Sequence, residues 1–243
     1  MTTLLSTAGL VKQFSGNRAL GPVDFRADAG EIVGLIGPNG SGKTTFFNVV
    51  TGFLKPTAGK VFWEGADIVP LSPGRRAKLG MVRTFQEKMV FSGLSVHENL
   101  LFSLIQLGAE DLDDRLIHDA LAYVGLPAKT VTQQAEDLSW GQCRLLGMAM
   151  ALILKPKLLL LDEPFAGLNR IAAAQVTDML QRLKKDGIGG IIVEHEMSLL
   201  LPLCDRVVVF SAGEILAEGS PDEILRKPEV RAAYFGTDHA AGH

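Results

Sequence analysis

The stretch from residue 37 to residue 45, GPNGSGKTT, constrains the fold of this chain more than any other segment. It matches the phosphate-binding pattern G-x-x-x-x-G-K-[ST] at every fixed position. The apolar run at 31–36 is typical of a short buried strand, and residues 45–50 continue as a helix. A strand, a glycine-rich loop and a helix in this order predict an α/β fold whose loop binds a nucleotide. The predicted nucleotide-binding residues are Gly37, Pro38, Asn39, Gly40, Ser41, Gly42, Lys43, Thr44 and Thr45.

The residue types in this loop suit a polyphosphate. Glycines let the backbone approach the ligand closely, so that successive N–H groups can point inward. Lys43 brings a mobile positive charge to the β- and γ-phosphates, and the Thr44 hydroxyl can bind Mg²⁺. A helix that starts after Gly42 adds the positive end of its dipole. We therefore expect a nucleoside triphosphate and Mg²⁺ as ligands.

The overall composition is that of a globular chain with no nucleic-acid-binding surface. The chain has 243 residues, 47% of them apolar, and its formal net charge of −3 gives no support for a nucleic-acid partner. Cys143 and Cys204 fit no metal spacing, which favours small buried side chains in a reducing compartment. Residues 1–14 show no secretory signal, and no apolar run reaches the ~18 residues of a membrane span. We expect a soluble chain, or one attached to a membrane only through a partner.

Hydrophobic periodicity divides the chain into an α/β part and a helical part. Short strands with a turn at 15–17 are predicted for residues 4–29. Further strands are predicted at 31–36, 59–65, 158–161, 191–193 and 207–210, and helices at 45–50, after Ser95, and at 113–124, 139–154 and 171–185, with one helical turn at 75–79. The sequence thus predicts a single domain, residues 1–243. Its α/β core, residues 1–87 and 156–236, surrounds a helical insert at about 88–155, and a disordered tail follows at 237–243.

Two carboxylates follow the four leucines at 158–161. This run is apolar on both faces, as expected of a central parallel strand, and ligands bind at the carboxyl ends of such strands. Asp162 can hold Mg²⁺, through water, and Glu163 can orient and polarise an attacking water molecule. Adjacent strand residues point to opposite faces, which suits two different roles. A strand that simply ends in acidic loop residues is the alternative.

Two further polar residues lie close to predicted strand ends. His195 follows the strand at 191–193, and Gln86 follows Thr84 and Phe85. On its own, a histidine in such a place is usually structural, and a glutamine carries little information.

Residues 138–142, with the sequence LSWGQ, open the third predicted helix of the insert. Ser139 and Gln142 fit a capping box, so a purely structural role is open. With the phosphate loop upstream and the aspartate–glutamate pair downstream, however, the order of motifs resembles the ATP-binding subunits of ABC transporters over essentially the whole chain. In that family the L-S-G-G-Q signature of one subunit contacts the ATP bound to the phosphate loop of another. The resemblance implies this role in trans for Ser139, Gly141 and Gln142.

The resemblance implies roles for residues outside these motifs as well. Phe14 matches the aromatic side chain that stacks on adenine, with a core phenylalanine as the alternative. Gln86 matches the glutamine that senses Mg²⁺ and the attacking water, and His195 matches the switch histidine that contacts the γ-phosphate. Together with Glu163, these two residues are the implied catalytic residues, and Gln86 joins Thr44 and Asp162 as an implied Mg²⁺ ligand.

The chain departs from the family pattern at two positions. Trp140 stands where the signature usually has glycine, and a backbone angle open only to glycine would be strained there. Because Gly141 is kept, we expect the site to form. Asn169 replaces the usual aspartate in the loop after Glu163.

The implied fold is a P-loop NTPase (RecA-like) core with an antiparallel β subdomain and a helical insert. Within the family the chain is most similar to the ATPases of branched-chain, or hydrophobic, amino-acid importers, on residues 83–86, 96–101, 140, 166–169 and 228–236. This implies an ATPase that powers import of a small solute from the cytoplasmic face of the cell membrane. Implied partners are a second ATP-binding subunit, identical or paralogous, integral membrane permease subunits and, indirectly, a solute-binding protein.

Several alternatives remain open. Urea and amide importers share much of the pattern. A soluble ABC ATPase not linked to transport and a small-molecule kinase with a phosphate loop are further possibilities. The implied contact with the membrane subunits involves residues 86–100, where Met89, Val90, Phe91 and Leu94 either form a groove for a short helix of the partner or pack inside the insert.

Overall fold

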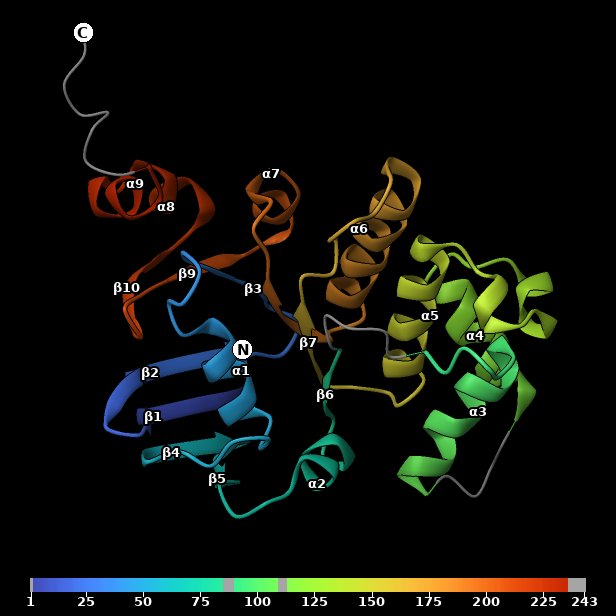
Figure 1. Ribbon diagram of the computed structural model, residues 1–243, viewed down its shortest axis with the longest axis horizontal. Coiled ribbons are helices and arrows are strands. Elements are labelled where there is room, and N and C mark those ends of the chain that lie inside the picture. The colour runs from blue at the N-terminus through green and yellow to red at the C-terminus, as the bar shows by residue number, and fades with distance from the viewer. Residues whose placement is uncertain (1, 85–89, 109–112, 236–243) are drawn as a thin grey trace, which may run out of the picture.

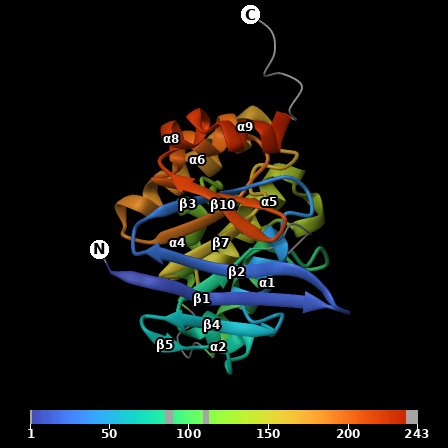
Figure 2. The same cartoon turned by 90° about the vertical axis from the view of Figure 1, so that its left-hand side faces the viewer.

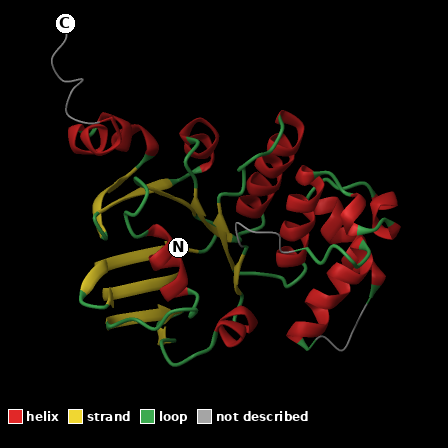
Figure 3. Ribbon diagram, in the orientation of Figure 1, coloured by secondary structure: helices red, strands yellow, loops and turns green. Residues whose placement is uncertain are grey.

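The computed structural model describes residues 2–84, 90–108 and 113–235 (Figure 1). Within these ranges the strands form one four-stranded and one six-stranded sheet. The helices at 96–107, 114–123, 140–152 and 170–185 lie on the side of the larger sheet that faces away from the smaller sheet (Figure 3). The predicted α/β class, with an antiparallel β part and a helical insert, is confirmed. Gln86 and the 237–243 tail lie outside the described residues.

The smaller sheet is antiparallel and has the order β2-β1-β4-β5 (Figure 2). Its strands are β1 (Thr3–Phe14), β2 (Asn17–Asp28), β4 (Ala58–Trp63) and β5 (Ala66–Asp67). The predicted turn joins β1 to β2, with positive φ values of 46° at Ser15 and 86° at Gly16. The turn reverses the direction of the chain, so that β2 runs antiparallel to β1.

The larger sheet has the order β10-β9-β3-β8-β7-β6, and all of its neighbouring pairs except β10-β9 are parallel. Its strands are β3 (Ile32–Ile36), β6 (Met81–Arg83), β7 (Leu158–Asp162), β8 (Gly189–Val193), β9 (Arg206–Ser211) and β10 (Glu214–Gly219). As predicted for a central strand, β7 is fully buried between two parallel neighbours. The sequence interpretation missed β10, half of whose residues are exposed and whose hydrophobic pattern is therefore weak.

The longer helices start where the sequence predicts, within a few residues. They are α1 (Lys43–Val50), α3 (Val96–Leu107), α4 (Asp114–Tyr123), α5 (Trp140–Leu152) and α6 (Arg170–Lys185). Helices α3, α4 and α5 lie together at one side of the molecule (Figure 1). The shorter helices are α2 (Pro73–Lys78), α7 (Met197–Leu200), α8 (Pro221–Arg226) and α9 (Pro228–Phe235), with 3₁₀ turns at Ala128–Thr132, Ala135–Asp137 and Leu201–Leu203.

Each face of the parallel sheet contributes to a separate hydrophobic core. One core lies against the antiparallel sheet and α1, where the ring of Phe46 is 5.0 Å from that of Phe25 and 5.5 Å from that of Phe210. The other lies under the helical part and includes Leu159 and Leu161, whereas Leu158 and Leu160 belong to the first core. This division follows from the alternation of side chains along β7.

Arg76 of α2 is a buried charge that ties α2 to the helix following the phosphate loop. Only 2% of the residue is exposed. Its Nη1 donates to the carbonyl oxygens of Val50 (2.6 Å) and Val49 (3.0 Å), at the C-terminus of α1. Its other nitrogens donate to the carbonyls of Leu71 and Val69. The cation therefore caps the negative end of the α1 dipole.

Replacement of Arg76 by methionine is expected to lower the free energy of unfolding by about 2–4 kcal/mol, because buried carbonyls lose their donor. Denaturant unfolding followed by circular dichroism measures this change. The neighbouring Arg75 is exposed, so Arg75→Met is a matched control and should shift stability by less than about 0.5 kcal/mol. Equal effects of the two variants would show that the buried hydrogen bonds contribute nothing.

Candidate nucleotide site

Neighbouring strands of the parallel sheet end at one pocket of about 190 Å³. The phosphate loop follows β3, the aspartate–glutamate pair ends β7, and His195 lies two residues after β8. The pocket is lined by Ala19, Asn39, Gly40, Ser41, Gly42, Lys43, Thr44, Thr45, Asp162, Glu163, Val193 and His195. The structure thus brings together most of the residues that were predicted to bind the nucleotide within one chain. Ala19, from β2, is a lining residue that sequence reasoning did not identify.

Two glycines of the phosphate loop occupy positions that exclude a side chain. Gly37 has a φ of 151°, and a Cβ there would lie 2.3 Å from the carbonyl oxygen of Phe210. Gly42 has a φ of 103° and is the N-cap of α1, with a Cβ position 3.0 Å from the Ala19 carbonyl oxygen. The glycine pattern is therefore required by both backbone angle and close packing.

Lys43 points its ammonium group back into the loop. Nζ donates to the carbonyls of Gly37 (2.7 Å) and Pro38 (3.1 Å) and lies 3.4 Å from the Ser41 hydroxyl. Burial lowers the pKa of Lys43, and the nearby charges of Glu163 and Asp162 act in the opposite direction. The ammonium group thus lies in a partly desolvated loop, where a bound anion would offset the cost of burying its charge.

Asp162 is paired with a cation that sequence reasoning did not identify as part of the site. Arg83, the last residue of β6, donates from Nη2 to Asp162 Oδ2 at 2.9 Å and from Nη1 to Asn48 Oδ1 at 2.6 Å. Both side chains of the ion pair are less than a tenth exposed. The pair holds the carboxylate against the end of β6, and no local pattern could reveal it because its partners are 79 residues apart.

The residues at the pocket suit a Mg²⁺ ion that is bound by protein oxygens and by phosphate oxygens together. The Thr44 hydroxyl and the Asp162 carboxylate are oxygen donors, and both line the pocket. Among the described residues no group of three or more His, Cys, Asp or Glu side chains could hold a metal ion alone. Mg²⁺ typically uses one or two protein ligands and completes its shell with phosphate oxygens and water, so this donor set fits it.

Glu163 sits in a strained turn that two other segments hold. Its φ is 49°, a left-handed angle that costs a non-glycine residue energy. Its N–H donates to the Val193 carbonyl at 2.8 Å, and its carbonyl accepts from Arg144 Nη2 at 2.7 Å. His195 Nε2 lies 3.1 Å from Glu163 Oε1. The predicted water-polarising acid and the predicted switch histidine are therefore in direct contact.

The predicted signature residues form the N-terminus of α5, away from this pocket. Ser139 and Gln142 make the capping box: the Ser139 N–H donates to Gln142 Oε1 (2.9 Å), and the Gln142 N–H donates to Ser139 Oγ (3.3 Å). Trp140 is the first helical residue and does not have a positive φ, so the change from glycine introduces no backbone strain. Its Nε1 donates to the Ala166 carbonyl at 3.4 Å. In one chain, the signature and the phosphate loop do not meet.

Three predicted nucleotide-binding residues, Gly37, Pro38 and Phe14, also lie outside the pocket lining, as does Asn169. Phe14 ends β1 with 44% of its surface exposed, and Lys12 Nζ is 5.0 Å from its ring centroid. Asn169 is the N-cap of α6, where its Oδ1 accepts from the Ala172 N–H at 2.9 Å, a role that asparagine and aspartate share.

A phosphate loop, an acidic pair at the end of the central strand and a histidine just after the adjacent strand define a nucleotide-hydrolysing protein of the P-loop class. Residues 20–166 match the sequence model of the ABC transporter family. Residues 214–240 match a second model, described as branched-chain amino acid ATP-binding cassette transporter. The chain therefore belongs to the ABC transporter family, as an ATP-binding subunit with ATPase activity.

Relatives similar over their whole lengths agree with this assignment. The probable branched-chain amino acid transport ATP-binding protein LivG of Archaeoglobus fulgidus is 36% identical over 250 residues, with 96% of this chain and 95% of that protein covered. The lipopolysaccharide export system ATP-binding protein LptB of Escherichia coli K12 is 35% identical over 237 residues, with coverage of 96% and 98%. The crystal structure of the ADP conformation of MJ1267, an ATP-binding cassette of an ABC transporter, has a TM-score of 0.87 at 32% identity, with coverage of 97% and 100%.

Within the described ranges, none of the helices combines the length and the apolar character needed to cross a bilayer.

Proposed function

We propose that the chain is the ATPase subunit of an importer for branched-chain or other hydrophobic amino acids, and that it works as a pair with a second ATP-binding subunit. The observation that carries the solute class is the match of residues 214–240 to the branched-chain model. Sequence identity over the whole chain does not distinguish amino-acid import from lipopolysaccharide export, because the LivG and LptB proteins are about equally similar to it. Urea or amide import remains the second candidate for the solute.

The cis half of the site is proposed to act on ATP through the residues of the pocket. The loop N–H groups and Lys43 bind the phosphates, as the cradle geometry suggests. Thr44, Asp162 and, from outside the described residues, Gln86 would hold Mg²⁺, which neutralises developing charge on the phosphates. Glu163 polarises the attacking water, and His195 contacts the γ-phosphate from the adjacent strand end. Phe14, exposed at the end of β1, stacks on the adenine.

The trans half of the site is proposed to come from α5 of the second subunit. Ser139 and Gln142 form the capping box of α5, and Gly141 lies in its first turn. The N-terminal dipole of this helix favours an anion. These residues are absent from the lining of their own chain's pocket. A second copy, or a paralogue, facing the first would place this helix end over the γ-phosphate. Because ATP would contact both chains only when the pair is closed, its binding favours the closed pair.

An apolar groove offers a docking site for the membrane subunits. Its volume is about 520 Å³, and it lies between the sheet edge with α2 and helices α3 and α5. Phe53, Phe91 and Phe102 line it and are 52%, 46% and 37% exposed, and the rings of Phe91 and Phe102 are 4.7 Å apart. A short helix of a membrane protein is the proposed occupant, which would place the chain at the cytoplasmic face of the membrane.

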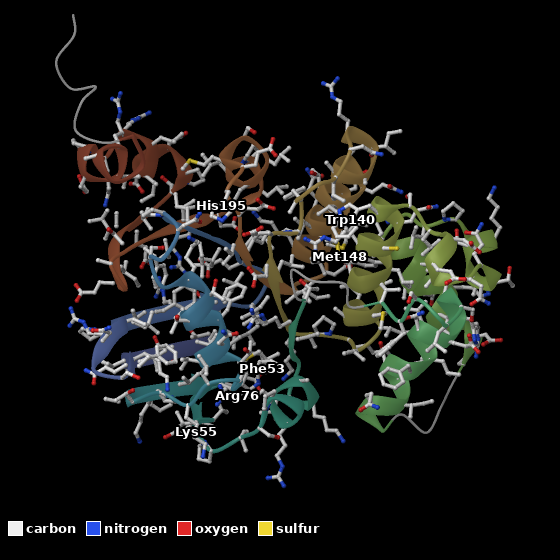
Figure 4. All side chains as sticks on the ribbon, in the orientation of Figure 1. Phe53, Lys55, Arg76, Trp140, Met148 and His195 are labelled. Atoms are coloured by element: carbon white, nitrogen blue, oxygen red, sulfur yellow. The ribbon has the colours of Figure 1, made fainter. Side chains whose placement is uncertain are left out.

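The residues that the sequence suggested for this groove do not all line it. Phe91 lines the groove, whereas Val90 is half-buried and packs against the core beneath the helical part. Leu94 is also half-buried, and Met89 lies outside the described residues. Phe53, which the sequence did not point to, lines the same groove as Phe91. It lies close to Arg76 and far from His195 in Figure 4.

The variant Phe53→Asp/Phe91→Asp is expected to lose co-purification with the membrane subunits while its ATP affinity stays within about twofold, because the buried anchors of an interface carry most of its energy. Pull-down and nucleotide titration measure the two properties. Leu225→Asp, at an exposed position on α8, is the control. Intact assembly of the double variant would exclude the groove as the docking site.

Reconstitution tests the proposed function as a whole. The chain, its membrane subunits and the solute-binding protein are placed in proteoliposomes with MgATP inside, and accumulation of labelled leucine, valine and urea is measured. ATP-dependent accumulation of leucine or valine supports the proposal. Accumulation of urea alone, or ATP hydrolysis with no uptake of any of the three, overturns the assigned solute class.

A further inference from the structure

Glu194 is a buried acid for which the proposed reaction has no use. It lies between the last residue of β8 and His195, and only 4% of its surface is exposed. A buried carboxylate needs several hydrogen bonds or a partner charge to offset the loss of solvation. The hydrogen bonds that Glu194 accepts therefore indicate its role in the structure.

The two oxygens of Glu194 bind two different loops. Oε1 accepts from the N–H of Phe165, in the loop that follows β7, at 2.8 Å. Oε2 accepts from the N–H of His195 at 2.9 Å and from that of Glu196 at 3.4 Å. One carboxylate thus joins the segment that carries the water-polarising acid to the segment that carries the switch histidine.

This bridge lies beside the strained turn at Glu163. The N–H of Glu163 is fixed on the carbonyl of Val193, next to Glu194 in sequence, and the chain is fixed again two residues later, where Phe165 donates to Glu194. Arg144, a residue of α5, donates to the Glu163 carbonyl. The negative charges of Glu163 and Glu194 also act on its guanidinium group. The left-handed angle at Glu163 is therefore held by contacts on both sides.

The chemistry of the bridge requires a carboxylate. The N–H groups of both loops converge on it, so both of its oxygens must accept. A glutamine of the same shape would turn an NH₂ group toward one of the two loops and lose its bond. The remaining loop could then move relative to the other.

We propose that Glu194 is a positioning residue for ATP hydrolysis: its carboxylate sets Glu163 and His195 at their mutual distance of 3.1 Å. This inference rests on the proposed roles of those two residues. Misplacement of a catalytic group by about 1 Å costs roughly 100-fold in rate. Phosphate binding should be unaffected, because no atom of the phosphate loop bonds to Glu194 in the described part of the chain.

The test uses the full-length chain and the variant Glu194→Gln. The expected result is a kcat for ATP hydrolysis reduced roughly 10- to 100-fold, with affinity for a fluorescent ATP analogue within about twofold of the parent. Glu194→Asp keeps two acceptor oxygens on a shorter side chain and should retain an intermediate kcat. The matched control, Glu196→Gln, removes an exposed carboxylate two residues away and should leave kcat unchanged.

A purely structural role gives a different pattern. If the folded Glu194→Gln protein has the parental kcat, or if kcat and ATP affinity fall together with the melting temperature, the proposal is wrong. Added to Glu163→Gln, the Glu194→Gln change should lower the rate little further, because both act on one step. An additional loss as large as the loss in the parent would contradict the proposal.

A measurement on the unmodified chain covers the case in which the variant does not fold. The amide protons of Phe165 and His195 should exchange slowly with deuterium in solution, and unprotected exchange of either would overturn the bridge. Failure of the proposed function has a separate signature: the parent chain would hydrolyse ATP no faster than Glu163→Gln. If the parent is active, Glu163→Gln is inactive and Glu194→Gln matches the parent, only the positioning role fails.

Discussion

Replacement of Glu163 by glutamine is expected to reduce ATP hydrolysis at least about 100-fold, the contribution typical of a general base. Glutamine keeps the shape and the contact distance to His195 but cannot take a proton from water. ATP binding should persist, because Lys43 and the loop glycines are unchanged. The variant should therefore accumulate as an ATP-bound dimer. Steady-state ATPase assays and size-exclusion chromatography with MgATP measure the two effects.

The same variant separates transport ATPases from the kinase alternative. A kinase with a phosphate loop has no need of a signature helix and would not dimerise in response to MgATP. Glu229→Gln, an exposed position on α9, is the control and should behave like the parent chain. Monomeric Glu163→Gln at saturating MgATP would argue against a clamp formed by two copies of this chain.

Replacement of Lys43 by alanine is expected to weaken ATP binding roughly 100-fold, because a charge-assisted hydrogen bond to phosphate in a desolvated loop is lost. Hydrolysis should fall below detection, and MgATP should no longer drive dimer formation. Isothermal titration calorimetry gives the affinity.

Lys55→Ala provides the matched control for the lysine change. Lys55 is exposed and lies far from His195 (Figure 4). Its removal should leave the ATP affinity unchanged. Because Lys43 also bonds to Gly37, Pro38 and Ser41, thermal unfolding of both variants shows whether the loop keeps its structure. Unchanged ATP affinity in a folded Lys43→Ala protein would refute the assigned role.

Features encoded by local patterns could be predicted from the sequence. The sequence predicts the strand before Gly37 and the four-leucine strand to within a residue or two of their observed ends. It also predicts the capping box at Ser139. Each of these features depends on residues that are close together in the chain. In contrast, β10 was missed because its exposed face carries a weak pattern and its position is set by pairing with β9.

The candidate site shows the same division. The pocket gathers the cis residues that a motif identifies, such as Lys43 and Asp162. The contacts that hold them were not predicted: Arg83 with Asp162, Arg144 with the Glu163 backbone, and Glu194 with Phe165. Each joins residues far apart in the chain, and only the folded sheet brings them together.

Trp140 shows how a departure from a motif can be misjudged from sequence. A glycine in the common signature suggests a special backbone angle, yet position 140 is an ordinary first residue of a helix, where tryptophan is tolerated. The ring instead packs near Gly167 and lies under the guanidinium of Arg144, whose carbon is 5.9 Å from the ring centroid.

The left-handed backbone at Glu163 has a consequence for how this chain could be engineered or could evolve. Glycine would relax that turn and raise folding stability by about 1 kcal/mol, but it would remove the carboxylate that we propose acts on water. Selection for thermal robustness alone would therefore favour an inactive ATPase at this position. The residue marks a point where stability and activity conflict, and screens for hardier variants should hold it fixed.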